Sequence, residues 1–75
     1  MKLSKKKVGV DLTGYSISPA NEIIYSAPCG HDRVLGEVFM RDGEPGVEIF
    51  HAIPVIQLHK VAHLAAGWAA RILNG

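Results

Sequence analysis

The sequence predicts an α+β domain in which a four-stranded antiparallel β-meander is followed by one long C-terminal α-helix packed on the sheet. Three observations lead to this prediction: short β-rich segments between turn formers, a hairpin pattern around DGEPG at 42–46, and about 20 residues without a helix breaker after Pro54. The chain has 75 residues, enough for one small domain with a single core. We therefore expect one domain over 1–75, with a flexible end at 1–4.

The first two strands are expected on either side of a loop at 13–20, which is rich in turn-forming residues. Apolar and polar residues alternate over 5–12, and this period of two indicates a half-buried strand. The segment 22–27 is short and rich in β-forming residues, so we expect it to form the second strand.

The clearest strand pair is a hairpin with arms at 34–41 and 47–53. The loop between them, at 42–46, contains two glycines and a proline. Both residue types favour a turn, because glycine readily adopts a positive φ angle and proline has a fixed φ angle. Both arms carry apolar residues on both faces, which leaves open whether the sheet is covered on one side or two. His51 shares a strand face with Ile49 and is expected to be a core histidine bonded to a backbone group.

The C-terminal helix is expected to begin at Pro54, whose missing N–H costs nothing in a first turn, and to stop at Asn74-Gly75. On a helical wheel its apolar residues fill about half of the circumference, more than the ~100° that an ordinary surface helix needs. A four-stranded sheet can cover only one stripe of such a helix. We expect that stripe to contain Leu58, Val61, Ala65, Trp68 and Ile72.

The remaining apolar flank of the helix consists mostly of small residues, which let two helix backbones approach closely. Because isologous pairing is the commonest way in which homodimers form, we expect this flank to bind a second copy or another protein. The alternative is that alanine is only a good helix former and that the flank stays exposed to water. The expected partner-binding residues are Ala62, Ala66, Ala69 and Leu73.

A small zinc site is an alternative function. His59 and His63 are one helical turn apart on the same face, and Cys29 and His31 lie in a C-G-H turn. These four residues complete a tetrahedral set if the turn lies over the helix. The sequence lacks the paired C-x-x-C spacing by which zinc sites are recognised. The alternative interpretation is that the two histidines are solvated and that the cysteine is a small buried residue. No metal or other cofactor is therefore expected.

Nucleic-acid binding is a further alternative, because the basic cluster of Lys5, Lys6 and Lys7 could contact phosphates from a flexible arm. A net charge of +1 and the lack of a helix-turn-helix or an RNA-reading aromatic pair weigh against it. The simpler interpretation is a lysine-rich end that keeps an edge strand from aggregating.

The expected function is that of a small non-enzymatic interaction protein, namely an adaptor, subunit or inhibitor. Cys29 near a histidine could form an activated thiolate, but the glycines are scattered and no phosphate-binding motif is present. No run approaches the ~20 apolar residues of a membrane span, so no membrane partner is expected. The single cysteine agrees with a reducing compartment, and we therefore expect a cytoplasmic protein.

Overall fold

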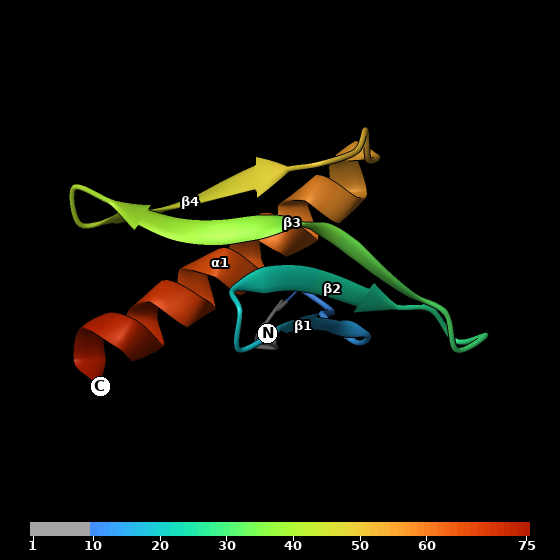
Figure 1. Cartoon of the computed structure of the whole chain (residues 1–75), viewed down its shortest axis with the longest axis horizontal. Helices are drawn as coiled ribbons and strands as arrows, with labels where there is room; N and C mark the ends of the chain where they lie inside the picture. Colours follow the sequence, from blue (N-terminus) through green and yellow to red (C-terminus); the bar gives the residue numbers. More distant parts are fainter. Residues whose placement is uncertain (1–9) are drawn as a thin grey trace, which may run out of the picture.

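The computed structural model describes residues 10–75, which form a sheet and a helix in two layers (Figure 1). The sheet order is β1-β2-β3-β4, and each neighbouring pair is antiparallel. The strands are β1 (Tyr15–Ile17), β2 (Glu22–Ser26), β3 (Asp32–Arg41) and β4 (Glu44–Ile49). Helix α1 (Val55–Asn74) follows β4 and packs on one face of the sheet. The predicted α+β meander with a C-terminal helix is confirmed.

The first strand lies elsewhere than the sequence predicts. Of the expected strand at 5–12, only residues 10–12 are described, and they form no strand. Strand β1 lies within 13–20, where the sequence predicts a loop, because this segment pairs with β2 and the Tyr15 ring packs against that of Tyr25 with centroids 4.7 Å apart. The flexible end expected at 1–4 lies outside the described residues.

The β3–β4 hairpin closes with a two-residue turn, not with the five-residue loop expected at 42–46. Only Asp42 and Gly43 separate the strands, and their φ angles are 55° and 81°. Two consecutive positive φ angles are the signature of the type I′ turn, which Asp-Gly favours because its twist matches that of the strands. Pro45 therefore belongs to the edge strand β4, where a missing N–H is tolerated.

The connection between β4 and α1 corrects the expectation for His51. Strand β4 ends at Ile49, and the backbone N–H of Phe50 donates to the carbonyl of Leu35 at 2.8 Å. Beyond this bond the chain bends toward the helix, so His51 is exposed and is not a core residue. The predicted arm at 47–53 is therefore too long at its C-terminal end.

The core lies between the sheet and one stripe of α1. A register shift in the β2–β3 pair contributes to it: Ile23 pairs with Gly36 and Ile24 pairs with Val34, which leaves Leu35 as the extra residue of a β-bulge. Half-buried tyrosines, isoleucines and Trp68 surround the buried side chains. The buried cluster consists of Ile23, Leu35, Val38, Val61 and Ala65.

The sheet-facing stripe of α1 differs from the predicted one at both ends. Leu58 and Ile72 are 41% and 51% exposed, although the sequence places both on the sheet. The helix crosses the sheet diagonally and its last turns extend past β1 and β2 (Figure 1), which agrees with the exposure of Ile72 in the last turn. The buried residues of the helix are Val61, Ala65 and Ala69. Among the described residues, no helix covers the opposite face of the sheet.

Candidate interaction surfaces

Large exposed hydrophobic residues gather on α1. In residues 10–75, eight such residues are exposed, and five of them belong to this one helix. Three are more than 60% exposed, so most of their side-chain area contacts water. Three of the five lie in the first turn and two in the last, so they mark the two ends of the helix and do not form one contiguous patch. The five residues are Val55, Ile56, Leu58, Ile72 and Leu73.

Four exposed residues lie along one side of α1, with the exposed His59 about 40° from their common direction, and we call these four residues the apolar flank. At 100° per residue, Val55 and Leu73 share one direction on the helical wheel, and Ala62 and Ala66 lie about 20° to either side of it. All four side chains are exposed. The apolar flank is directed about 120° away from Val61, which is fully buried against the sheet. It therefore lies beside the sheet-facing stripe and is available to a partner.

Three of the four partner-binding residues predicted from the sequence lie in this flank, namely Ala62, Ala66 and Leu73. Ala69 does not, because it is only 3% exposed and lies on the buried stripe of the helix. The prediction for Ala69 is therefore wrong. A helical wheel gives the width of an apolar arc but not the direction in which the sheet lies. The sequence alone therefore could not show where the sheet-facing stripe ends and the apolar flank begins. Val55 was missed, although its separation from Leu73 by five full turns is visible in the sequence.

Polar residues on the other side of α1 hold the helix on strand β1. The amide nitrogen Nε2 of Gln57 donates to the hydroxyl oxygen of Tyr15 at 3.0 Å, and Nζ of Lys60 lies 5.8 Å from the centroid of the same ring. The charged residues of the helix are Lys60 and Arg71, and it contains no acidic residue. Because both cations lie more than 120° from the apolar flank on the wheel, the flank is free of formal charge.

Asp11 lies near this contact between β1 and α1. The hydroxyl and the backbone N–H of Thr13 donate to its Oδ1 at 2.6 and 3.0 Å. These two hydrogen bonds hold the pKa of the Asp11 carboxyl below its ordinary value, and the positive charge of Lys60 adds to the effect. The carboxylate is fully exposed, so it supports the local turn and does not form a buried site.

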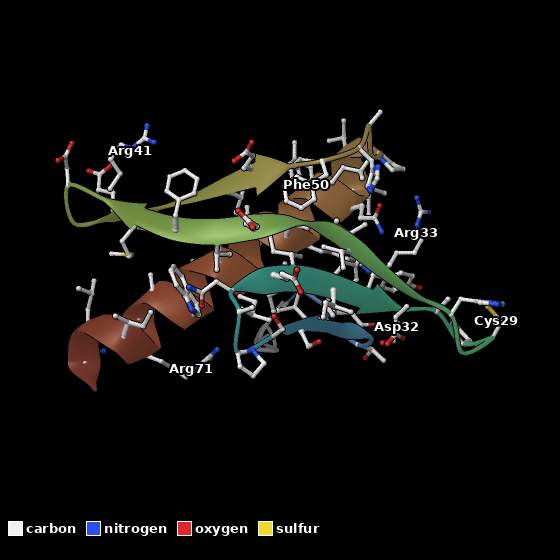
Figure 2. All side chains as sticks on the ribbon, viewed as in Figure 1. Cys29, Asp32, Arg33, Arg41, Phe50 and Arg71 are labelled. Atoms are coloured by element: carbon white, nitrogen blue, oxygen red, sulfur yellow. The ribbon has the colours of Figure 1, made fainter. Side chains whose placement is uncertain are left out.

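The proposed zinc ligands do not come together. Cys29 and His31 lie in the turn between β2 and β3, with Sγ 3.3 Å from Nδ1, and Figure 2 shows Cys29 at the far tip of that turn. His59 and His63 are exposed on α1. In residues 10–75, no group of three or more His, Cys, Asp or Glu side chains is arranged to hold a metal ion. The four residues therefore do not form one ligand set in this structure, because the turn points away from the sheet and does not fold over the helix.

Cys29 is exposed, so it is not the small buried cysteine of the simpler interpretation either. Within residues 10–75 no pocket lies beside the cysteine–histidine pair. Lys5, Lys6 and Lys7 fall outside the described residues, and nucleic-acid binding therefore stays a prediction from the sequence.

The sheet face opposite α1 is a second exposed surface, and it is acidic. The register places Glu37 of β3 directly opposite both Glu22 of β2 and Glu48 of β4, which gives a row of three carboxylates. Like charges that lie directly opposite one another destabilise a sheet. Apolar residues border the row, including Phe39, beneath the Arg41 guanidinium, and Phe50, which follows β4 directly (Figure 2).

Comparison with protein-family models, with curated proteins and with solved structures finds no match for the chain. Within residues 10–75, α1 falls short of the length and apolar character that crossing a bilayer requires. Any assignment of function therefore depends on the chemistry of the two exposed surfaces.

Proposed function

We propose that the protein is a small non-enzymatic interaction protein that acts as a homodimer, or binds another protein, through the apolar flank of α1. The observation that carries this proposal is that Val55 and Leu73 are 66% and 64% exposed in a chain of only 75 residues. Small domains bury a limited share of their surface and commonly gain stability by association. An adaptor, a subunit or an inhibitor would act through such a surface.

The expected strength of association follows from the size of these side chains. Fully burying a valine or leucine side chain stabilises by ~1.5–3 kcal/mol, and both are already about one third buried, so each contributes on the order of 1–2 kcal/mol. Two copies of each give on the order of 4–8 kcal/mol, before the loss of translational and rotational freedom is subtracted. A micromolar dissociation constant corresponds to about 8 kcal/mol after that subtraction, so these side chains alone are not sufficient and the alanines and their neighbours on the helix have to supply the remainder.

A cytoplasmic location fits this function. Cys29 is an exposed free thiol, with Sγ 3.3 Å from a ring nitrogen of His31. In an oxidising compartment an exposed thiol would form disulfides between molecules, whereas the reducing cytoplasm keeps it free. We therefore assign the protein to a reducing compartment and assign no catalytic role to this pair.

Sedimentation velocity over a range of micromolar concentrations tests the homodimer. The expected result is a shift from the mass of one chain, 8.1 kDa, toward twice that mass as the concentration rises. Ala66→Glu, which puts a charge in the centre of the apolar flank, should give a monomer at every concentration. Ala20→Glu is the matched control, because Ala20 is also exposed but lies in the turn between β1 and β2, outside α1. A monomer at high micromolar concentration for the unmodified chain contradicts the homodimer.

A further inference from the structure

We draw no further inference here: the strongest candidate, the row of Glu22, Glu37 and Glu48 on the open face of the sheet, is a cluster of acidic residues, and nothing in the structure shows what covers it.

Discussion

Gln57 in the first turn of α1 donates a hydrogen bond from Nε2 to the hydroxyl oxygen of Tyr15 in β1, at 3.0 Å, across 42 positions of sequence. The Tyr15 ring in turn lies against Tyr25 of β2 and beneath the ammonium group of Lys60. These contacts fix the rotation of the helix about its own axis. The side of α1 that carries Gln57 and Lys60 is held on β1, and the apolar flank is therefore kept off the sheet.

Loss of this hydrogen bond should loosen the helix. Gln57→Ala is expected to lower the free energy of unfolding by about 1 kcal/mol, the usual net contribution of a partly buried hydrogen bond. Urea denaturation at one fixed protein concentration measures the change, since association would otherwise alter the apparent stability. His63→Ala is the control, because its side chain is exposed on the same helix and should change stability by less than about 0.5 kcal/mol. Equal effects of the two substitutions would show that the contact with Tyr15 is unimportant.

Two valines on α1 should separate folding from association. Val61 is fully buried, and Val61→Ala is expected to lower the free energy of unfolding by about 2 kcal/mol through lost contacts and a cavity. Val55 is 66% exposed, so Val55→Ala should leave the unfolding of the monomer nearly unchanged but weaken the dimer severalfold. Urea denaturation at low concentration and sedimentation at high concentration measure the two effects. A dimer unaffected by Val55→Ala would contradict the role of this residue in the flank.

Replacement by alanine should destabilise the protein at Gly43 in the hairpin turn and stabilise it at Gly67 in the helix. Gly43 has a φ of 81° in the hairpin turn, with nothing within 4 Å of an added Cβ, so Gly43→Ala should cost about 1 kcal/mol from backbone strain alone. Gly67 lies within α1, where an added Cβ would come no closer than 3.8 Å to Arg71, so Gly67→Ala should stabilise by up to about 1 kcal/mol. Thermal unfolding followed by circular dichroism compares the two variants, and shifts of the same sign would contradict this assignment.

The sequence predicts the long elements of this fold more accurately than the short ones. The helix and the strands predicted over 22–27 and 34–41 have clear patterns, because each has its own periodicity or turn signals at its ends, and they form over 55–74, 22–26 and 32–41. Strand β1 has only three residues, between Gly14 and Pro19, and three residues are too few for alternation to outweigh neighbouring turn formers. Its position is set by pairing with β2, which is a tertiary effect.

The candidate surface on α1 could likewise be predicted only in part, because the rest depends on tertiary packing. The apolar arc of α1 can be predicted from its sequence, since the wheel depends only on the order of the residues. The part of the arc that the sheet covers depends on how the helix crosses the strands and where it extends beyond them. For this reason Ala69 proved to be buried, whereas Ile72, on the same side of the wheel, proved to be exposed.

Acid titration should detect the hydrogen bonds that Asp11 accepts. Because its pKa in the folded protein is lowered, the carboxylate contributes stability above its ordinary pKa, and this contribution is lost as the pH falls through the folded value. Thr13→Val removes the hydroxyl donor, which is the largest cause, so the pKa of Asp11 should rise toward its ordinary value. It should remain somewhat low, since the backbone N–H of residue 13 still donates. Side-chain chemical shifts followed by NMR give both values, and an unchanged pKa in Thr13→Val would contradict the assignment.

Repulsion within the carboxylate row on the open sheet face should lower the free energy of unfolding. Glu37 lies directly opposite both Glu22 and Glu48, so Glu37→Gln should raise the free energy of unfolding by roughly 0.2–1 kcal/mol. Glu44 lies opposite Arg41, so Glu44→Gln removes an attraction and should act in the other direction. Added salt should reduce both effects, since exposed charges are screened. Urea denaturation at low and high salt tests the pair, and stabilisation by Glu44→Gln equal to that by Glu37→Gln would contradict a specific repulsion within the row.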